Sequence, residues 1–128
     1  GLDEALRRGE AYAEAGADVL FIESPESEAE MASICERLRG VPLLANIVEG
    51  GRTPELPRDR LRKLGYSISI HPGSAFMAAA AACAGIYQSL KESGSTANAK
   101  PPLLGFPEMN ELIGFPAVWD FEKRHPES

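Results

Sequence analysis

Three short apolar runs alternate with helical patterns along the chain, and this alternation restricts the fold more than any other feature. The runs begin near residues 18, 41 and 66 and are continuously apolar, as in Asp18-Val-Leu-Phe-Ile-Glu23 and Val41–Ile47. A strand with one wet face alternates apolar and polar residues, whereas a continuous run suits a strand buried on both faces. The pattern therefore predicts an α/β protein with three parallel strands covered by helices.

Helical patterns separate and follow these strands. Apolar residues spaced three or four apart predict helices over residues 2–15, from Ser27 to Gly40, and over residues 57–64. Ser27 and Glu30 have the spacing of a capping box at the start of a helix. A longer helix is predicted after Ser74, which can cap it. We expect that helix to bury one stripe, formed by Phe76, Ala79, Ala80, Cys83, Tyr87 and Leu90.

The pattern changes after Leu90. Residues 92–102 are rich in Ser, Gly, Asn and Pro, which is typical of a linker. Two short helices are predicted over residues 107–113 and 116–123, each beginning with a proline. We therefore divide the chain into residues 1–92, which hold the strands, and residues 93–128, a linker and a helical tail. The apolar side chains of the tail predict that it docks on another surface, such as a partner subunit.

Three parallel strands cannot close a barrel, and they leave both edges of their sheet open. A complete (β/α)8 barrel takes about 250 residues, so the chain supplies roughly half of one. The sequence opens with Gly1 and enters a helix directly, without a starting methionine. We therefore expect residues 1–92 to be half of a (β/α)8 barrel that belongs to a longer protein.

The acidic composition limits the partners. A formal net charge of −6 and a pI near 4.9 argue against nucleic acid or an anionic membrane surface, because both bind basic patches. No apolar run approaches the ~20 residues that span a bilayer, and no leader pattern opens the sequence. We expect a cytoplasmic protein whose partner is a small molecule.

The two cysteines, Cys35 and Cys83, both lie inside helical patterns. This placement favours buried free thiols in a reducing compartment. A disulfide or a reactive thiol remains the alternative.

Polar residues follow each predicted strand, at the edge of the sheet where parallel α/β proteins bind ligands. Glu23 follows the first strand, Asn46 and Glu49 end the second, and His71 follows the third. We expect Glu23 to be partly desolvated, which raises a carboxyl pKa and suits a group that holds a substrate hydroxyl or a proton. The alternative is an ordinary capping or ion-pairing acid.

The other strand-end residues allow similar pairs of interpretations. The Asn46 amide can donate to a carboxylate or enolate oxygen, or it can satisfy neighbouring backbone. Gly50-Gly51 can let backbone amides approach a ligand, or can form an ordinary turn. His71 fits a polar loop residue better than a catalyst. No cluster of His, Cys, Asp or Glu has metal-ligand spacing, so we expect no metal ligand in this chain.

Four segments carry a family resemblance: "EAYAEAGADVLFIES", "VPLLANIVEGGRTP", "LGYSISIHPGSAF" and "MNELIGF". Together they resemble the C-terminal half of the isocitrate lyase / phosphoenolpyruvate mutase superfamily, with oxaloacetate decarboxylase-like and 2-methylisocitrate lyase-like enzymes as the nearest branches. The resemblance implies a (β/α)8 barrel whose last three strands lie in this chain. It also implies Mg²⁺ and a pyruvate enolate, because a divalent ion neutralises the developing enolate charge. A homotetramer is implied as well, assembled through the last barrel helix, here the one beginning near Ala75.

The resemblance assigns substrate-binding roles to four residues. Glu23 matches the family glutamate at the end of the sixth strand, and Asn46 matches an asparagine on the seventh. Val48 stands where the lyases often have threonine, and Glu49 matches the acid that follows. The family's metal-binding aspartates and catalytic cysteine are expected outside this chain, which alone is therefore expected to be inactive.

Two departures from the family bear on the substrate. Met77 and Met109 stand where 2-methylisocitrate lyases have arginines, and arginine binds carboxylates in a two-point geometry that methionine cannot reproduce. We therefore expect a carbon–carbon lyase or decarboxylase acting on a small keto acid such as oxaloacetate. The alternatives are a 2-methylisocitrate lyase or phosphonate-forming mutase of the same superfamily, and a non-catalytic half-barrel that needs a partner chain.

Overall fold

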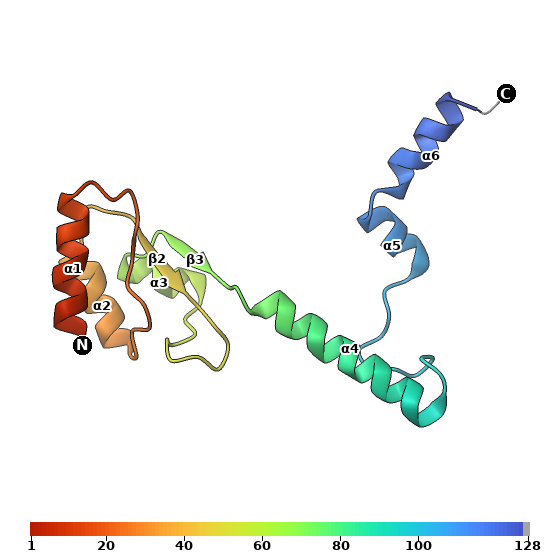
Figure 1. Ribbon diagram of the computed structural model, residues 1–128, viewed down its shortest axis with the longest axis horizontal. Coiled ribbons are helices and arrows are strands. Elements are labelled where there is room, and N and C mark those ends of the chain that lie inside the picture. The colour runs from red at the N-terminus through yellow and green to blue at the C-terminus, as the bar shows by residue number, and fades with distance from the viewer. Residues whose placement is uncertain (127–128) are drawn as a thin grey trace. The chain divides into compact units, whose positions relative to one another are not determined.

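The computed structural model describes residues 1–126 and contains one sheet and six helices (Figure 1). The chain divides into two compact units, Gly1–Ala78 and the residues from Ala79 on. In chain order the elements are α1 (Leu2–Glu14), β1 (Leu20–Phe21), α2 (Glu28–Arg37), β2 (Leu43–Asn46), α3 (Arg58–Leu64), β3 (Ile68–Ile70), α4 (Ser74–Ser93), α5 (Phe106–Leu112) and α6 (Phe115–Arg124).

The sheet has the order β1-β2-β3, and both of its pairings are parallel. Leu44 of β2 lies opposite Phe21 of β1 and Ile68 of β3, and Asn46 lies opposite Ile70. The predicted α/β class and parallel sheet are confirmed. The strands are shorter than their apolar runs, because β1 and β3 each pair with a neighbour on one side only.

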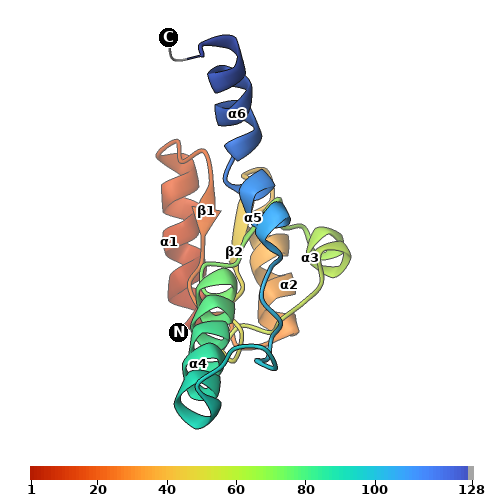
Figure 2. The same cartoon turned by 90° about the vertical axis from the view of Figure 1, so that its right-hand side faces the viewer.

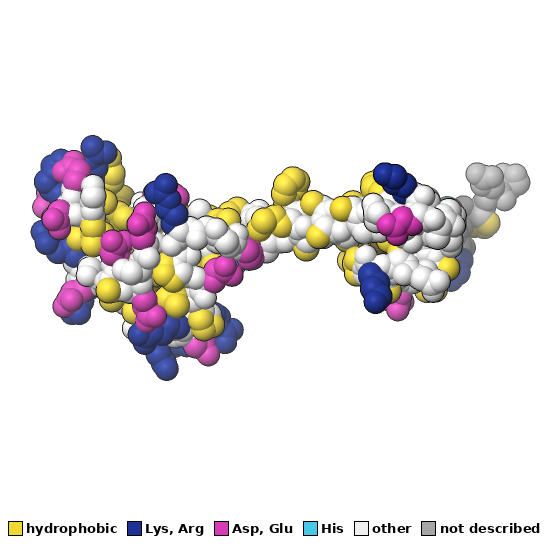
Figure 3. Space-filling view, turned by 90° about the horizontal axis from the view of Figure 1, so that it is seen from below, with side chains coloured by type: hydrophobic (Ala, Val, Ile, Leu, Met, Phe, Trp, Pro, Cys, Tyr) yellow, Lys and Arg dark blue, Asp and Glu magenta, His cyan; other side chains and the backbone are white. Residues whose placement is uncertain are grey.

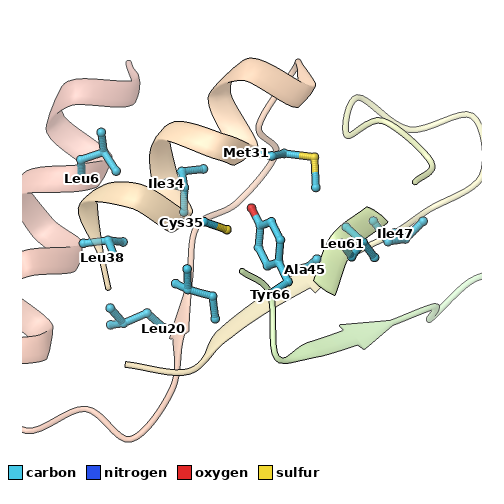
Figure 4. Packing of buried hydrophobic residues seen from close by; sticks show 11 residues of the cluster. Leu6, Leu20, Met31, Ile34, Cys35, Leu38, Ala45, Ile47, Leu61 and Tyr66 are labelled. Carbon is cyan, nitrogen blue, oxygen red and sulfur yellow. The ribbon is translucent and has the colours of Figure 1, made fainter. Parts of the chain in front are cut away.

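The hydrophobic core lies between the sheet and helices α1, α2 and α3, which follow one another across one face (Figure 2). Side chains of β2 alternate, so that Leu43 and Ala45 are buried against the helices, as is Ile47 just beyond the strand. Met31 and Ile34 of α2 are fully enclosed. Figure 4 shows this cluster, whose other members are Leu6, Leu20, Cys35, Leu38, Leu61 and Tyr66.

The other face of the sheet is open. Phe21, Ile68 and Ile70 are 45%, 39% and 40% exposed. The expectation that the strands are buried on both faces is therefore wrong for the described part of the chain, in which the helices of the first unit all pack on one side. In a closed barrel this face would turn inward, against side chains of the other strands.

The predicted helix start at Ser27 is confirmed in detail. The Ser27 hydroxyl accepts from the Glu30 backbone N–H at 3.1 Å. The Glu30 carboxylate reaches back to the N–H of Glu26 at 2.7 Å, one residue further than in the usual capping box. This pair fixes where the chain turns from β1 into α2.

Helix α4 does not bury the stripe that its sequence predicts. Phe76 and Tyr87 are 76% and 71% exposed, and no residue of the helix is buried. Figure 3 shows few charged side chains along it, in agreement with the sequence, where Lys91 and Glu92 are its charged residues. Burial of an apolar helix depends on a covering surface, and the described residues of the chain do not provide one.

The tail forms the two expected helices, with prolines in their first turns. They contact each other, and the rings of Phe115 and Trp119 lie 5.8 Å apart within α6. Both remain largely exposed. The compact units divide inside α4, whereas the division after residue 92 stays a prediction. In the described part of the chain, the helices fall short of the length and apolarity that crossing a membrane requires.

Candidate functional site

The ends of β2 and β3 bring five residues together. The Ser74 hydroxyl donates to Oε1 of Glu49, and His71 lies near enough to act on the charge of Glu49. A Cβ built on Gly73 would lie 3.9 Å from Oε2 of Glu49 and 2.9 Å from the Met77 methyl carbon. We call Glu49, His71, Gly73, Ser74 and Met77 the strand-end cluster. The hydrogen bond from the Ile47 N–H to the Ile70 carbonyl, 2.9 Å, holds its two halves in place.

Glu49 is exposed, yet its carboxylate accepts a hydrogen bond from another element, at Ser74. Its pKa is lowered by the hydrogen bond from Ser74, then by its own backbone N–H and by the charge of His71. The carboxylate is therefore ionised at neutral pH and acts as an acceptor. It suits a substrate hydroxyl or another donor rather than a bare substrate carboxylate.

Asn46 lies half-buried on the open face of the sheet, one residue beyond the buried Ala45. Its amide oxygen is fully buried and has no hydrogen-bond partner among the described residues. An unpaired buried acceptor costs about 1–3 kcal/mol, so this oxygen calls for an explanation, and a role in binding is one of them. The alternative that this oxygen satisfies neighbouring backbone is not what the structure shows. Val48, two residues on, is half-buried on the same side.

Gly50 and Gly51 form an ordinary turn. The Gly50 N–H donates to the Glu55 carboxylate at 3.0 Å, and the Gly51 N–H donates to the Val48 carbonyl at 2.9 Å. Gly50 has a φ of +71°, which glycine adopts without strain. Both amides are engaged within the loop, so the interpretation that they cradle a ligand is wrong.

Glu23 is exposed rather than partly desolvated, which corrects the expectation from its apolar run. The run pairs only over Leu20–Phe21, so Glu23 has already left the sheet. Its carboxylate accepts from the neighbouring Ser24 hydroxyl at 2.8 Å, and Ser24 has a φ of +53°. The hydrogen bond of Glu23 is thus local, and the structure does not tie it to the strand-end cluster.

A groove of about 650 Å³ lies elsewhere, between α1 and the edge strand β1. Tyr12, Val19, Phe21 and Glu23 are among its lining residues, and a smaller groove of about 380 Å³ continues past Glu23 toward Glu30. A mostly apolar groove along an unpaired strand edge fits another strand and helix better than a small polar molecule.

Cys35 is buried and Cys83 is exposed, and both are free thiols. Figure 4 shows the Cys35 sulfur beside the Tyr66 hydroxyl, whose interaction with the thiol lowers the Cys35 pKa. Burial outweighs this effect and raises the pKa of Cys35 to about 11, so the thiol is a poor nucleophile. The expectation of a buried thiol is confirmed for Cys35 and wrong for Cys83, which lies on the uncovered α4.

Among residues 1–126, the His, Cys, Asp and Glu side chains do not gather into a group of three that could hold a metal ion. Of the four predicted site residues, the structure places Glu49 in the cluster, Asn46 at the end of β2, Val48 in the loop that follows β2, and Glu23 outside the cluster. Ser74 was missed as a site residue. Its position directly after the third strand was the available signal, but its sequence context indicated a helix cap.

Comparison with known proteins agrees with this fold. Residues 1–91 match the family described as phosphoenolpyruvate phosphomutase. The chain is 45% identical over 125 residues to 2,3-dimethylmalate lyase of Eubacterium barkeri, covering 98% of this chain and 43% of the relative. It is 39% identical to 2-methylisocitrate lyase of Bacillus subtilis, covering 95% of this chain and 39% of that enzyme.

A solved structure shares this fold. The crystal structure of 2,3-dimethylmalate lyase, a PEP mutase/isocitrate lyase superfamily member, matches with a TM-score of 0.82 at 29% identity. The match covers 95% of this chain and 42% of that one. The chain thus spans less than half the length of the relatives that it matches almost from end to end.

Proposed function

Because this chain belongs to the phosphoenolpyruvate phosphomutase family, within the isocitrate lyase/PEP mutase superfamily, we propose that it forms part of a carbon–carbon lyase or decarboxylase. Its substrate would be a small dicarboxylic keto or hydroxy acid that reacts through a pyruvate enolate. The observation that carries the proposal is the buried amide oxygen of Asn46, which has no hydrogen-bond partner among residues 1–126 and lies at the carboxyl end of β2, three residues before the ionised Glu49.

The two side chains have complementary roles in this proposal. The Asn46 amide accepts from a substrate hydroxyl through its oxygen and donates to a carboxylate or enolate oxygen through its NH₂ group. Glu49 accepts a second hydrogen bond from a hydroxyl of the substrate. Val48 supplies an apolar contact between them. Glu23 binds the substrate at the same edge of the sheet once other parts of the enzyme cover its loop.

The dicarboxylate preference rests on Met77. Its methyl group lies against Gly73, in the strand-end cluster, where it offers an apolar contact and no charge. A third substrate carboxylate would find no arginine there to bind it at two points. Oxaloacetate fits this description, and so does a substituted malate, the type of substrate for which the 45% identical relative is named.

Mg²⁺ is proposed as the cofactor of the whole enzyme. The described residues do not fit such a site by themselves. The proposal therefore assigns the metal ligands, and the catalytic cysteine, to parts of the enzyme other than residues 1–126. When bound, the ion would neutralise negative charge on the reacting acid.

The open surfaces support assembly. The exposed sheet face and the groove along β1 suit the remaining strands of a barrel, and α4 suits a neighbouring subunit in a homotetramer. Cys83 tests the second part. Its alkylation should be slow in the assembled protein and fast in the dissociated protein, with the buried Cys35 as a thiol that stays unreactive in both. Equal rates for Cys83 would contradict docking through α4.

Two alternatives have specific support. The 39% identical relative favours 2-methylisocitrate, and the name of the matching family favours a phosphonate-forming mutase.

The test is an assay of the full-length protein with Mg²⁺ against oxaloacetate, 2,3-dimethylmalate, 2-methylisocitrate and phosphoenolpyruvate. We expect turnover of one of the two dicarboxylates and its loss in Asn46→Ala. The matched control is Ser33→Ala, which removes an exposed hydroxyl whose bond, 3.0 Å to the Ala29 carbonyl, lies on α2. Efficient turnover of 2-methylisocitrate alone would overturn the proposed substrate, and no turnover of any compound would favour the non-catalytic alternative.

A further inference from the structure

Ser74 and Glu49 join two elements that are 25 residues apart in the sequence. Ser74 is the first residue of α4, and Glu49 lies in the loop after β2. The Ser74 hydroxyl donates to one carboxylate oxygen, Oε1. The first turn of α4 therefore reaches back to the residue that the proposed function places beside the substrate.

Gly73 lies beside both Glu49 and Met77. A Cβ at this position would lie 2.9 Å from the Met77 methyl carbon, a distance that real Cβ atoms essentially never show, and 3.9 Å from Oε2 of Glu49. The backbone before α4 thus runs close to the second carboxylate oxygen, with the Met77 methyl on the same side.

An exposed glutamate has three rotatable bonds and samples several rotamers in water. Two restraints act on Glu49, the Ser74 hydroxyl and its own backbone N–H. The hydroxyl is the only one of these two that comes from another element. Removing it would leave the carboxylate attached to its own loop alone.

We propose that Ser74 is a positioning residue, whose hydroxyl fixes Oε1 of Glu49 so that Oε2 stays available to the hydroxyl of the substrate. This inference rests on the proposed function and deepens it, because it extends the site from β2 to the start of α4. Ser74 itself does not touch the reacting atoms. Its effect passes through the orientation of Glu49.

The experiment compares Ser74→Ala, Ser74→Thr and the control Ser33→Ala in the full-length protein. Threonine keeps a hydroxyl at residue 74, and Ser33→Ala removes an exposed serine hydroxyl from a different helix. For each variant we would measure kcat and KM with the dicarboxylate that the protein turns over, and the pKa of Glu49 by carbon-13 NMR of labelled glutamate. His71, the titratable group that acts on Glu49, is followed in a parallel titration of the protein with labelled histidine.

We expect Ser74→Ala to lower kcat by on the order of tenfold with little change in KM, as when an interaction that matters in the transition state is lost. The pKa of Glu49 should rise toward its ordinary value in the same variant. Ser74→Thr and Ser33→Ala should resemble the unchanged protein in both measurements.

Three outcomes would overturn the inference: an unchanged Glu49 pKa in Ser74→Ala, a shifted pKa without a change in kcat, or a Ser74→Thr variant as impaired as Ser74→Ala. A protein that turns over none of the substrates would instead overturn the proposed function. In that case the Glu49 titration alone still decides whether Ser74 holds the carboxylate.

Discussion

The hydroxyl of Tyr66, two residues before β3, lies beside the sulfur of Cys35 on α2, inside the core (Figure 4). Burial, first of all, raises the pKa of both groups, and the Cys35 thiolate raises that of Tyr66 further. The pair is therefore neutral and structural at physiological pH, and its chemistry appears only in strongly alkaline solution.

Alkaline pH should destabilise the protein through Cys35. Its pKa is about 11 in the folded chain against an ordinary value of 9.0, so the folded state holds the proton more tightly. The free energy of unfolding should be nearly constant between about pH 7 and 9, and Cys35 should lower it by roughly 2–3 kcal/mol between about pH 9 and 11. Urea denaturation at a series of pH values measures this. In Cys35→Ala the free energy of unfolding should fall less steeply with pH over this range. An unchanged fall would show that Cys35 does not cause it.

Gly65→Ala should destabilise the fold. Gly65 ends α3 with a φ of +121°, and a Cβ there would lie 3.1 Å from the Cβ of Cys35. Backbone strain alone costs about 1–2 kcal/mol. Gly40→Ala is the control, because Gly40 has a φ of +101° with nothing within 4 Å. In thermal unfolding we expect Gly65→Ala to be worse than Gly40→Ala by about 1 kcal/mol, and equal losses would mean that the contact with Cys35 is irrelevant.

Asn46→Leu should separate stability from function. The substitution removes a buried acceptor that has no partner in the described structure, so the free energy of unfolding should rise by about 1 kcal/mol. Substrate turnover should fall by about a hundredfold or more, because the amide that binds the substrate is gone. Denaturant unfolding and steady-state kinetics on the same sample test both parts. A variant that loses stability, or keeps activity, would show that the amide serves the fold.

Met77→Arg should move substrate preference toward tricarboxylates. Arginine at this position brings a planar, charged group into the strand-end cluster, near the carboxylate of Glu49. The ratio of kcat/KM for 2-methylisocitrate to that for oxaloacetate should rise by on the order of tenfold. Met109→Arg provides the comparison, since it stands at the second position where the resemblance indicates an arginine. If this ratio is unchanged in both variants, the two methionines do not determine substrate specificity.

Local sequence was enough to predict the order of elements. Continuous apolar runs with helical segments between them have few solutions other than a parallel sheet, and the Ser27 cap follows from contacts within four residues. The strand-end interpretation located Asn46 and Glu49 for the same reason, because the carboxyl ends of parallel strands meet at one edge.

The features that sequence did not predict all depend on distant neighbours. The role of Ser74 requires the loop after β2 to lie beside the start of α4, which no local pattern specifies. The predicted burial of the α4 stripe and of Glu23 was wrong for a related reason. An apolar run indicates that a surface should be covered, but not whether this chain covers it. Gly50-Gly51 is a third case, because the same two residues fit both a ligand-binding backbone and an ordinary turn. The hydrogen bonds to Glu55 and Val48 show the turn.

Helix α4 begins at the strand-end cluster and runs without interruption through Ser93, across the boundary between the two compact units. A helix advances by about 100° per residue, so one residue inserted among Ala78–Ala82 would leave the contacts of Ser74 intact and rotate every later side chain by that angle. Deleting one alanine would rotate the later side chains by about the same angle in the opposite direction. The number of alanines in this run therefore sets which face of α4 each later apolar side chain occupies.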